Sequence, residues 1–178
     1  AEISPIVENS LGINYSLQLE TGIYNRAVFA SNMFSSNELN FKVFAPVSKS
    51  LGENGTLNMN VLIDANSNKI KEPSFAAPKY NTSLIAIQPS YEREWKDIKF
   101  FIGLYPTFGQ KIHLLPNAYA QKFIAPLKSN VQVGVESEVL TNSFKELSLF
   151  NPWLSPLSQL IQSKRTLFYV SLSGSPIN

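Results

Sequence analysis

The 178-residue sequence contains no cysteine and a single histidine, His113. The absence of cysteine excludes a disulfide framework, thiolate metal sites and a cysteine nucleophile. One histidine cannot build a zinc site unless carboxylates supply the other ligands. The usual metal and nucleophile chemistries are therefore largely missing from this chain.

Charged side chains are also scarce, at 16% of the residues, against about 25% in an average soluble domain. Asparagine and serine, with 17 and 22 residues, outnumber the 28 charged residues. The net charge is only +2, and the longest basic run is Lys164-Arg165, which argues against binding of nucleic acid. A surface hydrated by amides and hydroxyls suits a secreted, cell-surface or virion protein; the alternative is a compositional bias of the source organism.

Long apolar runs are absent, because no stretch approaches the roughly 20 residues that a membrane helix needs. We therefore expect no membrane span. The sequence opens at Ala1 without an apolar leader, so we expect a removed signal peptide or a shortened chain. The expected location is extracellular or at the cell surface, and the length predicts a single β-rich domain over residues 1–178.

Alternation of apolar and polar residues is the main structural signal. Leu57, Met59 and Val61 alternate with Asn58 and Asn60, which predicts a strand with an apolar face on the core and an asparagine face toward water. Similar signals mark further strands. They lie at 13–20, 39–45, 83–88, 111–115, 131–140 and 166–172. The run 98–105 is apolar throughout, which predicts a central strand covered on both faces.

Turn and cap residues divide these strands. Asn54-Gly55 predicts a turn in a long loop that joins 39–45 to 56–63 as an antiparallel hairpin. Pro73 and Pro78 predict that 64–82 is a surface loop. Ser143 with Glu146 forms a capping-box pattern, and Ser155-Pro156 offers a second helix start, so short helices are expected between 143 and 163.

These elements predict an all-β fold, a β-sandwich or jelly-roll-like structure with one or two short helices near 143–163. The alternative is an α+β fold, with 90–96 as a further helix. Residues 1–10 form a possible extended N-terminal arm, because Ile3, Ile6 and Val7 are apolar ahead of the first strand. Such an arm suits strand donation to a neighbouring copy, although it could equally fold back on its own domain.

The best candidate binding residues are Tyr91, Arg93 and Trp95, which combine aromatic area with a guanidinium group. Aromatic rings of this kind also stack on sugars. The alternative is structural: Tyr91 and Trp95 would point into the core, while Glu92, Arg93 and Glu94 would face solvent.

Catalytic and metal patterns are weak. His113 lies in an apolar run and is expected to be buried or half-buried and noncatalytic. Glutamate pairs two residues apart could serve a hydrolase, although such pairs are common on exposed strands. They are Glu92 with Glu94 and Glu136 with Glu138. Asp64, Asn66 and Asn68 match the start of a calcium loop without its glycine and final glutamate, so a solvated loop is expected instead. No catalytic residue, metal or cofactor is predicted.

The sequence thus favours an extracellular structural or interaction subunit, such as a surface filament, adhesin or capsid-like protein. Its expected partners are copies of itself, through homotypic β contacts, and a glycan or other cell-surface ligand. The alternative is a secreted carbohydrate- or ligand-binding β-sandwich module, and a carboxylate-based hydrolase is a minor one. Sequons at Asn14, Asn54 and Asn81 occur about as often as chance predicts and carry no argument.

Overall fold

The computed structural model describes residues 7–8, 12–27, 35–71, 79–151 and 162–174. These residues form ten strands, one short α-helix and a 3-10 turn. The elements are β1 (Val7–Glu8), β2 (Ile13–Tyr15), β3 (Gln18–Ala27), β4 (Ser35–Ser50), β5 (Gly55–Lys71), β6 (Lys79–Trp95), β7 (Ile98–Phe108), β8 (Ile112–Ile124), η1 (Ala125–Leu127), β9 (Ser129–Leu140), α1 (Phe144–Phe150) and β10 (Ser163–Gly174).

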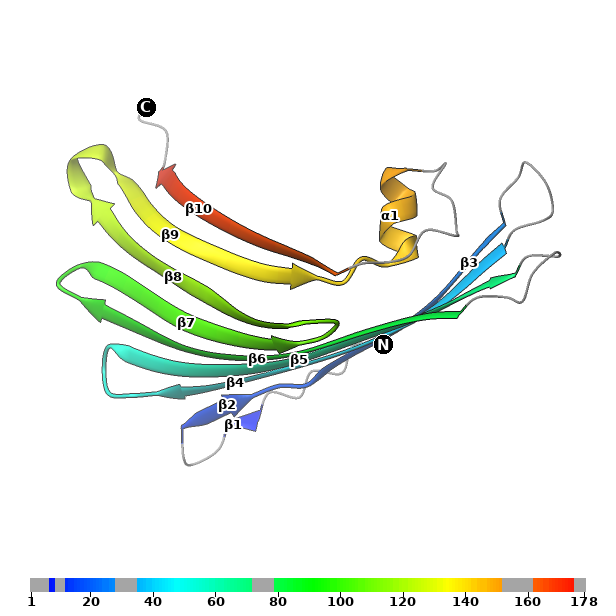
Figure 1. Ribbon diagram of the computed structural model, residues 1–178. Helices are drawn as coiled ribbons and strands as arrows, with labels where there is room; N and C mark the ends of the chain where they lie inside the picture. Colours follow the sequence, from blue (N-terminus) through cyan, green and yellow to red (C-terminus); the bar gives the residue numbers. More distant parts are fainter. Residues whose placement is uncertain (1–6, 9–11, 28–34, 72–78, 152–161, 175–178) are drawn as a thin grey trace.

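All the strands belong to one antiparallel sheet in the order β1-β2-β4-β5-β6-β7-β8-β9-β10, and β3 pairs with β4 beside β2. Successive strands are neighbours from β4 to β10, so the sheet is a meander of hairpins. Figure 1 shows that the sheet curves strongly, so that β9 and β10 rise above β4, β5 and β6, with α1 on the concave side. The prediction of an all-β fold with a short helix is confirmed.

Several strands are longer than the alternation predicted. The expected loop at 64–82 is wrong, because β5 continues to Lys71 and β6 begins at Lys79; residues 72–78 lie outside the described part. The loop between β4 and β5 is also short, with Gly52 at a φ of 72° and the Leu51 N–H donating to the Gly55 carbonyl at 2.7 Å. The polar side chains of 64–82 predict a loop, but those of Asn66 and Asn68 lie on the buried face of a strand.

The helix expected in the α+β alternative at 90–96 is a strand instead. Residues 90–95 complete β6, and Lys96 and Asp97 turn the chain into β7 with φ values of 48° and 63°. Two consecutive left-handed residues match a type I′ hairpin turn, whose twist suits the flanking strands.

Helix α1 begins where the capping pattern predicted. The Ser143 hydroxyl accepts a hydrogen bond from the Glu146 N–H at 3.1 Å, and Asn151 ends the helix after two turns. The second expected helix start, at Ser155-Pro156, lies outside the described residues.

The polarity of the sheet is the reverse of the expected one. On β5, Asn66, Asn68 and Ile70 are buried, whereas Leu57 and Met59 are exposed. The asparagine face therefore lies on the concave side under α1, and the apolar face lies on the outer, convex side. Strand β7 shows the same inversion, since Ile102 is 64% exposed, and the expectation that 98–105 is covered on both faces is wrong.

The interior of the sheet is correspondingly polar. The buried polar side chains outnumber the buried apolar ones among the described residues. Ser36, Glu38, Asn66, Asn68, Thr82, Ser90, Thr107, Asn117, Ser137, Ser143 and Ser148 are buried polar residues, beside Ile70, Leu84, Ala86, Leu115 and Phe144. Phe144 of α1 belongs to this small apolar core, and hydrogen bonds join several of the buried polar side chains.

Candidate functional site

A buried carboxylate fixes α1 to the concave face. Glu38 of β4 is fully buried, and its Oε2 accepts hydrogen bonds from the Phe144 N–H at 2.6 Å and the Lys145 N–H at 3.2 Å. These donors belong to the first turn of the helix, where backbone N–H groups have no partner within the helix. On the next turn, Ser148 Oγ lies 3.1 Å from the Tyr24 hydroxyl of β3. The helix is thus tied to two neighbouring strands.

Burial raises the pKa of the Glu38 carboxyl above its ordinary value, although the N–H groups of Lys145 and Phe144 and the Asn40 amide oppose the shift. The nearby Glu146 charge raises it further. Its other oxygen, Oε1, has no hydrogen-bond partner within the described part of the chain. No sequence motif marks Glu38; its place among the alternating polar residues of β4 is the one signal that could have identified it.

A cleft of about 640 Å³ lies beside this helix on the concave face. Its charged lining residues are Glu20, Lys42, Asp64, Glu138 and Glu146, which makes the cleft acidic. Glu20 and Asp64 stand on either side of Lys42 in the strand register. The Asp64 carboxylate accepts hydrogen bonds from the Thr141 hydroxyl and, at 3.3 Å, from the Asn66 amide.

A second polar group lies on the concave side of β6, β7 and β8. The Lys99 ammonium forms an ion pair with Glu92 at 2.8 Å, and the Tyr119 hydroxyl donates to the same carboxylate at 3.3 Å. The Tyr119 ring stacks on Phe101, with centroids 5.0 Å apart. The bond to Glu92 raises the pKa of Lys99, whereas burial and then the Glu92 charge raise the pKa of Tyr119.

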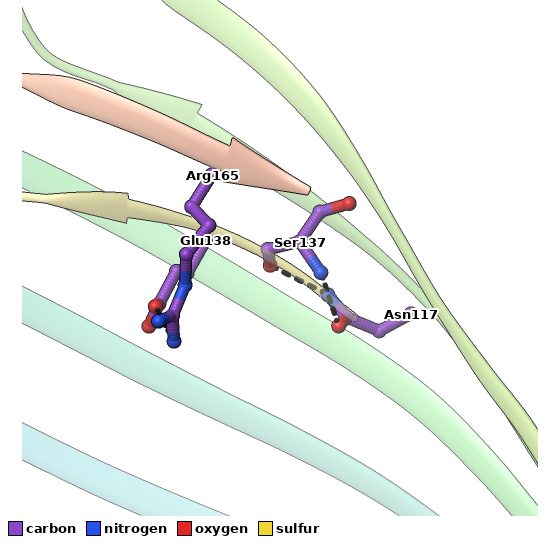
Figure 2. Close-up of polar contacts among 4 residues, drawn as sticks. All are labelled: Asn117, Ser137, Glu138 and Arg165. Carbon is purple, nitrogen blue, oxygen red and sulfur yellow. Dashed lines mark hydrogen bonds and ion pairs between the residues drawn. The ribbon is translucent and has the colours of Figure 1, made fainter. Parts of the chain in front are cut away.

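A third polar group joins β8, β9 and β10 (Figure 2). The Asn117 amide donates to the Ser137 carbonyl at 3.0 Å, and its oxygen accepts from the Ser137 N–H at 2.8 Å. Arg165 of β10 forms an ion pair with Glu138 at 2.5 Å. Glu92 and Glu138, each one member of a glutamate pair considered for hydrolysis, are therefore both engaged with cations.

The predicted binding residues lie on the opposite, convex face. Tyr91, Arg93 and Trp95 follow each other on one face of β6 and line a depression of about 320 Å³ with Phe100 and Ile102 of β7. Trp95 is 55% exposed, with the Lys96 ammonium 4.8 Å from its ring centroid. The structural alternative is wrong for Trp95, which is exposed on the convex face, and Tyr91 is half-buried on the same face; Arg93 and Glu94 are exposed, as that alternative expected. The depression is mostly apolar, and Arg93 is its one charged residue.

The other singled-out residues fall on the concave side. His113 is half-buried, as expected, and its backbone carbonyl accepts a hydrogen bond from the Thr107 hydroxyl at 3.3 Å. Asp64, Asn66 and Asn68 lie on one face of β5, not in a solvated loop, and the Asn68 amide oxygen accepts from Ser36 at 2.7 Å. The residues that the structure describes contain no cluster of three or more acidic, histidine or cysteine side chains placed to hold a metal.

Within the described ranges, no helix is both long and apolar enough to cross a membrane. Comparison with protein-family models, curated proteins and solved structures finds no match. Three features of the chain therefore bear on its function: its polar concave face, its apolar convex face and its strand edges.

Proposed function

We propose that the protein is a structural or interaction subunit of the cell surface that assembles with its own copies through the free edge of β10. The observation that carries this proposal is that one edge of β10 has no partner strand among the described residues. In the described part of the chain, β10 pairs only with β9, from Ser163 opposite Leu140 to Gly174 opposite Ser129. Eleven of its twelve residues are exposed.

A long exposed edge strand offers a row of backbone N–H and C=O groups to another strand. Pairing with a second chain satisfies those groups, and neighbouring side chains then add contacts across the new pair. Phe168 and Val170, at 80% and 78% exposed, stand on this strand and would be covered on one side by such a partner. Charged side chains of the kind that block edge pairing are confined to its first residues, Lys164 and Arg165.

The N-terminal arm supports the proposal less directly. Val7–Glu8 pairs with residues Asn14–Tyr15 of the same chain, and the rest of 1–10 lies outside the described residues. Donation of this arm to a neighbour therefore stays a prediction, and the β10 edge is the better-defined contact.

Disulfide cross-linking tests the assembly cleanly, because the chain has no cysteine of its own. We expect the Ser171→Cys variant to form covalent dimers on mild oxidation, since β10 lies at an edge. The matched control is Asn60→Cys on the central strand β5, which has neighbours on both sides. A sedimentation mass of 19.9 kDa for the native chain at high concentration, together with equal cross-linking at the two sites, would overturn the proposal.

A second candidate function is ligand binding at the depression formed by Tyr91, Arg93 and Trp95. The observation that favours it is the exposed indole beside a guanidinium group, which suits stacking on a sugar ring. A glycan array with Trp95→Ala as the control tests this function. Neither proposal involves catalysis, and a reducing-sugar assay tests the hydrolase alternative.

A further inference from the structure

We propose that the convex face of the sheet contacts the hydrocarbon of a lipid membrane. This face is separate from the β10 edge, but the inference rests on the proposed assembly in one respect. Hydrocarbon supplies no hydrogen bonds, so a free strand edge at membrane depth must be paired with another strand.

The apolar face is continuous across the sheet. Two cross-strand rows run through the sheet without a charged residue. One row, read from β3 to β8, is Leu19, Val43, Ile63, Ile85, Phe108 and Ile112. The other, from β5 to β10, is Leu57, Tyr91, Ile102, Ala118, Val135 and Phe168. Together they cover eight neighbouring strands, and a contiguous apolar face of this kind on a protein surface marks an interaction site.

Charged residues of the convex face border an apolar band on the central strands. On β5 this face carries no charged residue from Leu57 to Ala65. Lysines stand beyond it, with Lys69 near the end of β5 opposite Lys79 at the start of β6. At the other end lie Lys49 of β4 and Arg93 of β6. An apolar band bordered by cations at both ends matches a hydrocarbon layer between two polar surfaces.

The height of that band is close to the thickness of the hydrocarbon in a bilayer. From Leu57 to Ala65 the chain makes eight steps of about 3.3 Å, or roughly 26 Å along the strand. A tilted strand needs about 9–11 residues to cross the hydrocarbon of a bilayer. Amphipathic aromatic residues also gather toward one end of the band, where Tyr91 and Trp95 lie near Arg93. Tyrosine and tryptophan favour the membrane–water interface.

The convex shape and the lack of hydrogen-bonding side chains on the two rows favour lipid over a folded protein as the partner. Protein interfaces carry about one hydrogen bond per 100–200 Å², and their rims are polar. The two rows offer no charged group and, apart from the Tyr91 hydroxyl, no polar side chain for such bonds. Fluid acyl chains need none and follow a curved surface. The polar concave face, with its buried asparagines and serines, then faces away from the lipid.

The test is flotation of the full chain with dioleoylphosphatidylcholine vesicles. The chain is diluted from urea into the vesicles and spun through a density gradient at high salt. We expect it to float with the vesicles and to resist extraction by fresh urea. Because the lipid is zwitterionic and the salt concentration is high, electrostatic attraction between this +2 chain and the vesicles cannot cause the flotation. A folded chain that remains in the soluble fraction would overturn the inference.

Two variants at neighbouring positions of β5 test which face of the sheet contacts the lipid. Val61→Asp places a charge in the middle of the apolar band and should lower vesicle partition at least about tenfold. Asn60→Asp, one residue away on the concave face, should partition like the native chain. Equal partition of the two variants would contradict the inference. The Ser171→Cys cross-link separates it from the assembly: a floating chain without a cross-link refutes only the edge contact, and a cross-linked chain that does not float refutes only the lipid contact.

Discussion

The side-chain amide of Asn117 makes both hydrogen bonds of a peptide group to Ser137, accepting from its N–H at 2.8 Å and donating to its carbonyl at 3.0 Å. The regular pairing of β8 with β9 ends one residue away, at Ala118 opposite Val135. Pro116, the residue before Asn117, has no N–H to donate. Asn117 therefore extends the contact between two strands beyond the point where their backbones pair.

Replacing Asn117 by alanine should lower the free energy of unfolding by about 1–3 kcal/mol, because it leaves the buried backbone groups of Ser137 without their partner. Chemical denaturation measures this. The matched control is Asn81→Ala, since Asn81 is exposed on β6, and it should change the stability by less than about 0.5 kcal/mol. Equal losses in the two variants would show that the Asn117 bonds carry no special weight.

Glu38 should make stability depend on pH. Its folded-state pKa is raised above 4.5, so the folded chain binds this proton more tightly than the unfolded chain. The stabilisation by the protonated carboxyl is present below the pKa of the group in the unfolded chain. It is lost as the pH rises through the raised pKa of the group in the folded chain. Glu38→Gln keeps an acceptor oxygen for the Phe144 N–H and should flatten this part of the profile, as measured by unfolding at a series of pH values.

Glu38→Ala supplies the contrast at neutral pH. It removes the acceptor of the Phe144 and Lys145 N–H groups, so we expect a loss of about 1–3 kcal/mol and weaker protection of α1 in hydrogen exchange. A pH profile unchanged in Glu38→Gln, or an alanine variant as stable as the native chain, would contradict the role of this carboxylate.

The Arg165–Glu138 ion pair should contribute little. The two side chains are 60% and 34% exposed, and solvent screens such pairs to about 0–1 kcal/mol. Arg165→Met should therefore change the midpoint of chemical denaturation only slightly, with less effect still at high salt. A loss of several kcal/mol would mean that the pair is more deeply involved in holding β10 on β9 than its exposure indicates.

His113→Gln should leave the fold intact. The hydrogen bond recorded at this residue uses its backbone carbonyl, which the substitution retains. We expect thermal unfolding close to that of the native chain and an unchanged yield of the Ser171→Cys cross-link. A large loss of either would reveal a role for the imidazole.

The alternation of residues predicted the fold class well. Leu57, Met59 and Val61 do share one face of a strand, and Asn58 and Asn60 share the other. Period-two alternation is symmetrical, however, and does not say which face is inside. The rule that apolar residues face the core fails in this sheet, because Asn66 and Asn68 are buried and Leu57 is exposed. The error in the loop at 64–82 had the same cause.

The candidate sites were predictable in part. Residue type singled out Tyr91, Arg93 and Trp95, although their common strand face was not predicted, and the capping pattern marked Ser143 as a helix cap. The contacts of Glu38 with Phe144 and of Asp64 with Thr141 join residues that lie more than 70 positions apart. No local pattern encodes such contacts, because they depend on how far the sheet curves.

In the proposed lipid contact, the convex face lies in hydrocarbon while the concave face stays wet. The most direct measurement is a nitroxide scan of single cysteines at positions 57 to 65 of β5, made in lipid vesicles, because this chain offers no competing thiol. We predict that collisions with oxygen peak at Leu57, Met59, Val61, Ile63 and Ala65, whereas collisions with a water-soluble nickel complex peak at the positions between them. A scan with no alternation, or with nickel peaks at the apolar positions, would contradict the account.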